Sequence, residues 1–285
     1  MAQVVGCICT SHVPAIGGAL AKGLQSDPYW KPFFDGFPPV RAWLDEVKPD
    51  IAVVFYNDHG LNFFLDTVPT FAVGAADEYS NEDEGWGIPA LGSFAGDPKF
   101  SWHIIESLVR GEFDPASCQK MLVDHAFSLP MQLLWPDRPK RPRASVPIAI
   151  NTVQHPLPSP KRCFNLGQTI GQAIASYPKD LKVVILGSGG LSHQLDGERA
   201  GFINKEFDLR CMDLLVHDPG ALLHYSIEDL IELTGSQGVE LINWIAARGA
   251  LTGSVGKLHS NYHIPISNTA AGLLLLENME IATAG

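Results

Sequence analysis

Residues 51–60, IAVVFYNDHG, join a run of apolar and aromatic residues to a short polar turn that contains His59. A run rich in β-branched and aromatic side chains and closed by turn residues is typical of a strand buried on both faces of a sheet. A single histidine after a strand is more often a hydrogen-bonding residue than a metal ligand. Recurrence of the pattern would favour a ligand-binding role, because ligands of open α/β sheets bind beyond the carboxyl ends of the strands.

The same pattern occurs at two further places in the chain. The apolar residues 4–9 lead to a polar segment with His12, and residues 181–186 lead through a glycine-rich turn to His193. Residues 146–153 form a fourth apolar run. Three histidines at strand ends could converge on one site, and neutral imidazole is the commonest protein ligand for transition metals.

Helical periodicity lies between and after these strand candidates. The clearest helical segments are residues 40–47, 126–134, 166–177, 205–216 and 239–247. This alternation of strands and helices predicts an α/β fold with a central, mostly parallel sheet flanked by helices on both faces. We expect a single domain over residues 1–285.

Composition and charge narrow the possible functions. The chain has 285 residues, 46% of them hydrophobic, and a formal net charge of -11, which suits a globular enzyme. The negative net charge argues against a nucleic-acid partner, because phosphate binding requires clustered Lys and Arg. The five cysteines include no CxxC pair, which predicts a reduced, cytoplasmic protein. We expect neither a secretory signal nor a membrane span, since the apolar run at residues 273–276 is too short.

A metal site at the strand ends would also need a carboxylate. Two imidazoles and one carboxylate form the facial set that leaves open positions on Fe(II). Glu240 is a candidate near a predicted helix start, although a glutamate there can simply complement the helix dipole. Asp58 is a rival candidate, but it adjoins His59, and neighbouring side chains on an extended segment point apart. Residue types and spacing therefore leave the carboxylate ligand open.

Other motifs fail their spacing tests. The glycine-rich turn before His193 lacks the third glycine of the dinucleotide fingerprint, because position 192 is serine. Ser188 lacks a flanking glycine of the nucleophile elbow. The acidic residues 77–86 and the basic, proline-rich residues 136–143 are typical of solvated loops. The histidines without a repeated context are predicted to be structural: His103, His155, His217, His224, His259 and His263.

Four segments together resemble a known enzyme family. They are SHVP with His12, NDH with His59, GSGGLSH with His193, and the late helix with Glu240. In this order they resemble the class III extradiol dioxygenases, most closely the catalytic β subunits of the protocatechuate 4,5-dioxygenase type. The resemblance spans essentially the whole chain. Only the combination of segments is specific, since each segment alone is not.

The resemblance implies a role for each of these residues. His12, His59 and Glu240 fall where the family binds Fe(II). Two neutral histidines and one carboxylate leave a ferrous site with one net positive charge, which can lower the pKa of a bound catechol hydroxyl while O2 takes the remaining position. His193 falls on the acid/base histidine of the family, and an imidazole can take up the catechol proton and later return it.

Two further residues have implied roles in substrate binding. His125 falls on a second pocket histidine of the family, with a catalytic and substrate-binding role; without the resemblance it would be read as the first residue of a helix. Ser267 falls on the hydrogen-bond donor to the substrate carboxylate, and would otherwise be a turn or cap hydroxyl. No Arg or Lys adjoins the motif histidines in the sequence, which leaves Ser267 as the expected carboxylate partner.

The resemblance finally implies extradiol cleavage of a catechol carboxylate, with protocatechuate as the expected substrate and O2 as the co-substrate. The sequence ends soon after Ser267, so we expect no fused lid but a separate small α subunit in a hetero-oligomer of the α2β2 kind. The alternative is a related extradiol enzyme for gallate, another catechol or an aminophenol. A second alternative is a non-catalytic metal-binding interaction protein.

Overall fold

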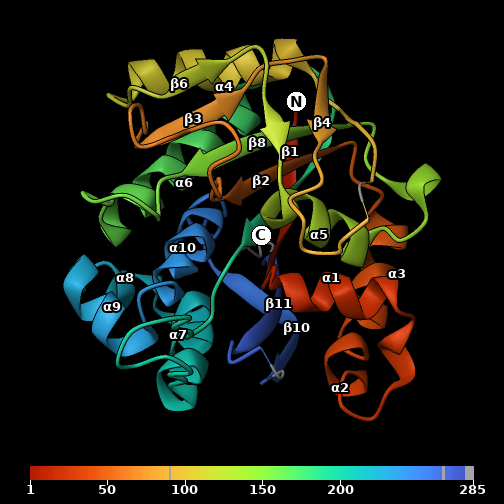
Figure 1. Cartoon of the computed structure of the whole chain (residues 1–285). Coiled ribbons are helices and arrows are strands. Elements are labelled where there is room, and N and C mark those ends of the chain that lie inside the picture. Colours follow the sequence, from red (N-terminus) through yellow and green to blue (C-terminus); the bar gives the residue numbers. More distant parts are fainter. Residues whose placement is uncertain (90, 265–266, 280–285) are drawn as a thin grey trace, which may run out of the picture.

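The computed structural model describes residues 1–89, 91–264 and 267–279, and an eight-stranded sheet forms its centre (Figure 1). In sheet order the strands are β10 Val255–His263, β11 Ala271–Asn278, β1 Gln3–Thr10, β9 Lys182–Ser188, β2 Ile51–Tyr56, β8 Ala144–Ile150, β3 Phe71–Gly74 and β6 Ala116–Cys118. The four predicted strands correspond to β1, β2, β8 and β9, which confirms their existence.

Parallel pairing sets the direction of the central strands. β1 pairs with β9, β9 pairs with β2, and β2 pairs with β8, all in parallel. Towards the edges, β11 pairs antiparallel with β1, and β3 pairs antiparallel with β8. The sheet is therefore mostly parallel at its centre, as predicted, and the carboxyl ends of β1, β9 and β2 lie at one edge.

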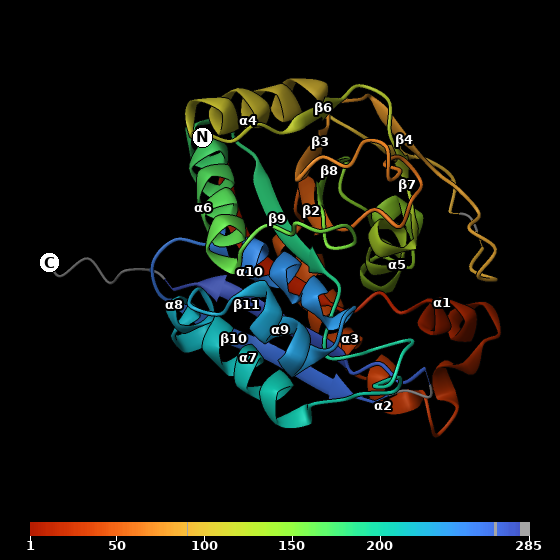
Figure 2. The same ribbon diagram turned by 60° about the vertical axis from the view of Figure 1, so that its left-hand side comes forward.

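Helices cover both faces of this sheet (Figure 2). One layer contains α4 Pro98–Arg110, α6 Pro160–Ser176, α7 Lys205–His217, α8 Pro219–Leu222, α9 Ile227–Thr234 and α10 Leu241–Gly249. The other contains α1 Pro14–Ala21, α2 Lys31–Phe34, α3 Phe37–Val47 and α5 His125–Leu134. Alternate residues of β2 join the two cores: Ile51, Val53 and Phe55 the first, and Ala52, Val54 and Tyr56 the second. This explains why β2 is apolar throughout.

A second, three-stranded sheet lies beside α5. It consists of β5 Phe94–Ala95, β4 Glu78–Asn81 and β7 Leu122–Val123. The acidic segment 77–86, predicted as a solvated loop, therefore contains a strand, and only its later part is irregular. The basic segment 136–143 contains the short 3-10 helix η2 Arg138–Lys140 and is mostly exposed, in agreement with the prediction.

Some boundaries and elements differ from the sequence predictions. β8 ends at Ile150, before the predicted end at residue 153, because Asn151 begins a turn and accepts hydrogen bonds from the N–H groups of Val153 and Gln154 (3.1 and 3.0 Å). The strands β10 and β11 and the helices α1, α4 and α9 were not predicted. The apolar residues 273–276 lie inside β11. In the described part of the chain, no helix has the length and apolar character needed to cross a membrane.

Close packing of α6 against α10 generates a stability prediction. A Cβ added at Gly167 on α6 would overlap the backbone oxygen of Ala246 on α10. Gly167→Ala should therefore lower the free energy of unfolding by about 1–3 kcal/mol in urea denaturation, because the helices must separate. Gly18→Ala on α1 is the matched control, since its added Cβ meets nothing within 4 Å. It should stabilise the fold slightly or be neutral. Equal destabilisation by the two substitutions would contradict this explanation.

Candidate active site

A cavity of about 620 Å³ lies at the edge of the sheet where the central parallel strands end. Residues from distant parts of the chain line it, because the loops after these strands all open on this edge. The six residues predicted to form the site are all among its lining residues: His12 after β1, His59 after β2, His125 at the start of α5, His193 after β9, Glu240 in the 3-10 helix η3 Gly238–Glu240, and Ser267 before β11.

Three of these residues converge at the inner end of the cavity. The Nε2 atom of His12 lies 3.4 Å from Oε2 of Glu240, and the Nε2 atom of His59 lies 3.7 Å from Oε1. The imidazole centroids of His12 and His59 are 5.3 Å apart. His12 and Glu240 are buried, whereas the His59 side chain is 29% exposed on the cavity side. Two imidazole nitrogens and a carboxylate thus surround one small space.

Hydrogen bonds on the outer side of each imidazole determine which nitrogen faces this space. The Ser188 hydroxyl donates to the backbone oxygen of Ala126, so it can accept from Nδ1–H of His12 at 2.9 Å. The Asp124 carboxylate accepts from both the backbone N–H and Nδ1 of His59, each at 2.9 Å. Both histidines therefore direct Nε2 towards Glu240 and, when neutral, can keep their proton on Nδ1, which is the arrangement of metal-binding histidines in general.

The charges of the three groups depend on one another. Burial disfavours ionisation of Glu240, but His12 and His59 outweigh it and hold the pKa of this carboxyl well below its usual value. Burial lowers the pKa of His12, and Glu240 offsets only part of this effect. Burial also opposes the charged form of His59, but hydrogen bonds with Asp124 and Glu240 raise its pKa well above the usual value. An ionised carboxylate flanked by two imidazoles can exchange a bound proton for a cation, so these donors fit a divalent metal.

His125 is an alternative to Glu240 as the third ligand of a metal. Nitrogen atoms of His12, His59 and His125 lie within 4.8 Å of one another. The ring of His125 is 5.4 Å from that of His12 and 4.4 Å from that of His59, measured between centroids. The geometry therefore allows two ligand sets, which share His12 and His59 and differ in whether Glu240 or His125 completes them.

His193 lines the same cavity without joining the cluster. Its Nδ1 lies 2.9 Å from the backbone oxygen of Leu191, and its backbone N–H donates to Thr234 at 2.7 Å. The ring therefore donates through Nδ1 and leaves Nε2 free as a proton acceptor. Asp208 fixes the preceding residue, because its carboxylate accepts from the backbone N–H and the hydroxyl of Ser192 (2.9 and 2.6 Å). A buried imidazole with one free nitrogen suits a general base.

The glycine-rich turn before His193 lets the backbone approach Glu240. Gly189 has a φ of +131°, and a Cβ there would lie 2.8 Å from Cβ of Glu240. Its neighbour Gly190 donates its N–H to Oε2 of Glu240 at 3.2 Å, and Asn57 donates to Oε1 at 3.1 Å. The glycines serve the carboxylate rather than a phosphate, consistent with the failed dinucleotide fingerprint.

Ser267 has a free polar atom at the cavity. Its hydroxyl oxygen is buried and has no hydrogen-bond partner among the described residues. No Arg or Lys occurs among the described residues that line the cavity. A buried hydroxyl without a partner is costly unless a ligand satisfies it, so Ser267 can donate to a ligand here. Asp58, the rival carboxylate, points elsewhere and accepts from backbone N–H groups of residues 60–63.

Sequence reasoning missed several residues of the site. Ser188 and Asp124 orient the two histidines, and Glu84 contacts His125, but none of the three was predicted to take part. Trp86, on the segment predicted to be solvated, also lines the cavity. Only Asp124 had a usable signal, because an aspartate just before a helix predicts an N-cap, and it does cap α5.

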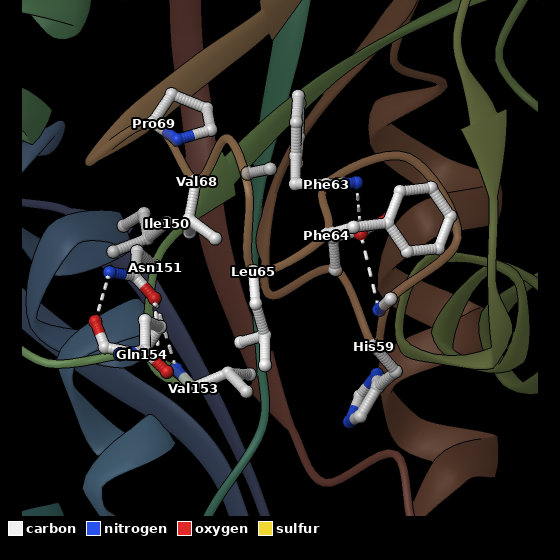
Figure 3. A pocket seen from close by; sticks show the side chains of 13 residues that line it. His59, Phe63, Phe64, Leu65, Val68, Pro69, Ile150, Asn151, Val153 and Gln154 are labelled. Carbon is white, nitrogen blue, oxygen red and sulfur yellow. Dashed lines mark hydrogen bonds between the residues drawn. The ribbon is translucent and has the colours of Figure 1, made fainter.

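A second, apolar pocket of about 280 Å³ adjoins the cavity (Figure 3). The two share His59 and Val153. Figure 3 shows Phe63, Phe64 and Leu65 opposite a wall that includes Val68, Pro69 and Ile150. Asn151, a polar residue of this pocket, is engaged in the turn that ends β8. The apolar surface therefore continues from the candidate site past His59.

Comparisons with known proteins agree with this site. A gallate dioxygenase of Pseudomonas putida is 41% identical over 200 residues, which cover 70% of this chain and 58% of that relative. A 2,3-dihydroxyphenylpropionate/2,3-dihydroxicinnamic acid 1,2-dioxygenase of Photorhabdus laumondii is 33% identical over 191 residues, or 67% of this chain and 56% of the relative. The chain thus matches less than two thirds of the length of either relative.

A fold comparison and a family model complete the assignment. The crystal structure of an uncharacterized protein from Escherichia coli K12 has a TM-score of 0.51 at 12% identity, over 96% of this chain and 100% of the other, and so shares the fold. The model of the family described as the catalytic LigB subunit of aromatic ring-opening dioxygenase matches residues 6–272. Because that match covers nearly the whole chain, this protein belongs to the LigB family of aromatic ring-opening dioxygenase subunits.

Proposed function

We propose that this protein is an Fe(II)-dependent extradiol dioxygenase that opens the ring of a catechol carboxylate, with gallate as the leading substrate. The observation that carries the proposal is the convergence of His12, His59 and Glu240 in one cavity with His193. Two imidazoles and a carboxylate are the donor set of non-haem Fe(II) oxygenases. Family membership and the two dioxygenase relatives support the same reaction class.

Each side chain has a defined task in this proposal. When bound, Fe(II) supplies positions for both catechol oxygens and for O2, and lets electron density pass between them. The free Nε2 of His193 accepts a proton from a catechol hydroxyl and returns it later in the reaction. Ser267 donates a hydrogen bond to the substrate carboxylate. Both atoms of O2 enter the product, so no further reductant is required.

The substrate assignment changes from the one expected from the sequence alone. Protocatechuate was expected there, with gallate as an alternative. The gallate dioxygenase relative, at 41% identity, favours the alternative, and protocatechuate becomes the second candidate. Both are catechol carboxylates, so both need a carboxylate partner. Among the described lining residues that partner is a neutral donor such as Ser267 rather than a basic side chain.

We also propose that a second polypeptide covers the cavity. Three apolar side chains that line the cavity are strongly exposed: Trp86 (59%), Val153 (61%) and Leu195 (62%). Apolar groups gathered around a polar site are typical of a surface that binds a partner. A cover would exclude water from the reacting groups and strengthen their electrostatic interactions. A small α subunit, as expected from the sequence, would serve this purpose.

The two possible ligand sets predict different metal losses. Glu240→Ala and His12→Ala should each lower the affinity for Fe(II) by at least about a hundredfold, since even outer-sphere residues typically contribute tenfold to a hundredfold. His125→Ala should retain the metal. Metal content after anaerobic reconstitution and desalting measures this, with the exposed His217→Ala as a control. If His125→Ala loses iron while Glu240→Ala keeps it, the ligand assignment is wrong.

His193 should affect the reaction but not metal binding. We expect His193→Phe to retain Fe(II) and to bind catechol under anaerobic conditions, yet to cleave the ring about a hundredfold more slowly, because a positioned acid/base is lost. Stopped-flow measurement of ring cleavage, beside a metal assay, tests this prediction. Iron loss in His193→Phe would instead make His193 a ligand.

The reaction itself is tested by O2 uptake. We expect the Fe(II)-loaded protein, assayed alone and with its partner polypeptide, to consume one O2 per gallate, with kcat/KM at least about tenfold above that for protocatechuate or 2,3-dihydroxyphenylpropionate. The partner should increase the rate. A preference for protocatechuate would reinstate the expectation from the sequence. Absence of uptake with every catechol, despite bound iron, would favour the non-catalytic metal-binding alternative.

A further inference from the structure

Glu84 differs from the other acidic residues of its segment. It follows β4, and its side chain is only 12% exposed, whereas the adjacent Glu82 and Asp83 are exposed. Its carboxylate binds His125 through both oxygens. Oε2 accepts from the backbone N–H of His125 at 2.6 Å, and Oε1 lies 2.9 Å from Nδ1 of the same residue.

Helix capping alone does not account for this contact. Asp124 is already the N-cap of α5, and its side chain accepts from the N–H of Ala126 at 3.0 Å. A carboxylate that only capped the helix would need just one oxygen, which would accept a hydrogen bond from a backbone N–H. Glu84 uses its second oxygen for the imidazole ring. The contact therefore constrains the side chain of His125 as well as the helix.

The bond to Nδ1 determines which nitrogen His125 presents to the cavity. A carboxylate accepts only, so the neutral ring must carry its proton on Nδ1 and leave Nε2 as an acceptor. The rings of His12 and His59 lie 5.4 and 4.4 Å away, between centroids, on the side where the candidate metal site is located. An acceptor at this position can receive a hydrogen bond from a hydroxyl of a bound catechol.

We infer that Glu84 is a positioning residue, which holds His125 in the Nδ1–H form so that its Nε2 accepts a hydrogen bond from the substrate hydroxyl. The hydrogen bond to the substrate in this inference rests on the proposed function, whereas the tautomer of His125 does not depend on it. Glu84 also anchors the segment that carries Trp86, whose ring lies 6.4 Å from that of His125 and lines the cavity. One carboxylate thus fixes a polar and an apolar part of the cavity wall.

The arrangement repeats the one at His59. Asp124 accepts from the backbone N–H and from Nδ1 of His59, as Glu84 does from His125. One carboxylate oxygen of Glu84, one of Asp124 and one ring nitrogen of His125 lie within 4.8 Å of one another. Carboxylates behind imidazoles orient the rings and select their tautomers, and loss of such a residue typically reduces activity or metal affinity tenfold to a hundredfold.

The test compares Glu84→Ala and Glu84→Gln with Glu82→Gln, which removes one negative charge from an exposed position of the same segment. The first readout is the tautomer of His125, from ring nitrogen NMR shifts of metal-free protein labelled at histidine and held at a pH where imidazole is neutral. Wild type and Glu82→Gln should have the proton on Nδ1. Glu84→Ala should shift towards the Nε2–H form, because the acceptor at Nδ1 is lost.

The second readout is kinetic. Glu84→Ala should retain iron but lower kcat/KM for gallate by about tenfold to a hundredfold. Glu84→Gln should recover part of this loss, because its amide oxygen can accept only one of the two N–H groups. If Glu84→Ala does not fold, the similarly shaped Glu84→Gln provides both readouts. An unchanged tautomer, or kinetics equal to those of Glu82→Gln, would overturn the inference. If wild type cleaves no catechol, the proposed function fails, while the NMR shifts still decide whether Glu84 positions His125.

Discussion

The parallel pairing of β1, β9 and β2 brings the residues of the candidate site together at one edge of the sheet. Thr10 pairs with Ser188, and Phe55 pairs with Gly187, so the three strands end at nearly the same level. Each strand is buried on both faces, and a shift in register would move its apolar side chains into the wrong core. The loops that begin beyond this level therefore start from fixed points. This brings His12 and His59 together although they are far apart in the sequence.

Behind the histidines, a buried hydrogen-bond network maintains their orientation. Ser188 accepts from His12 through its hydroxyl, while its backbone oxygen accepts from Asn243 at 2.8 Å. Trp244 donates to the backbone oxygen of Gly189 at 2.8 Å, next to Glu240. Hydrogen-bonded groups in a low-dielectric interior resist displacement, because breaking a bond would leave a costly unpaired group. The fold itself therefore holds the candidate metal donors in place.

Much of this arrangement could be predicted from the sequence, and the missing parts share a cause. His12, His59 and His193 follow apolar runs, so their meeting follows from local patterns and the geometry of parallel sheets. Glu240 was assigned only through the family resemblance, because a glutamate near a helix start has an ordinary electrostatic explanation. Glu84 could not be predicted, since its contact with His125 joins residues 41 positions apart through a segment without periodicity. β10 was missed because its sequence, VGKLHSNYH, is mostly polar, and the apolar residues 273–276 of β11 were considered only as a possible membrane span.

The account depends most on the identity of the three proposed metal ligands, His12, His59 and Glu240. The most direct measurement is a crystal structure of anaerobically reconstituted protein, with the ion located by anomalous scattering at the iron edge. We expect one iron about 2.0–2.6 Å from Nε2 of His12, Nε2 of His59 and a carboxylate oxygen of Glu240, with His125 and His193 outside bonding distance. An iron bound by His125 in place of Glu240, or located away from these strand ends, would contradict the account.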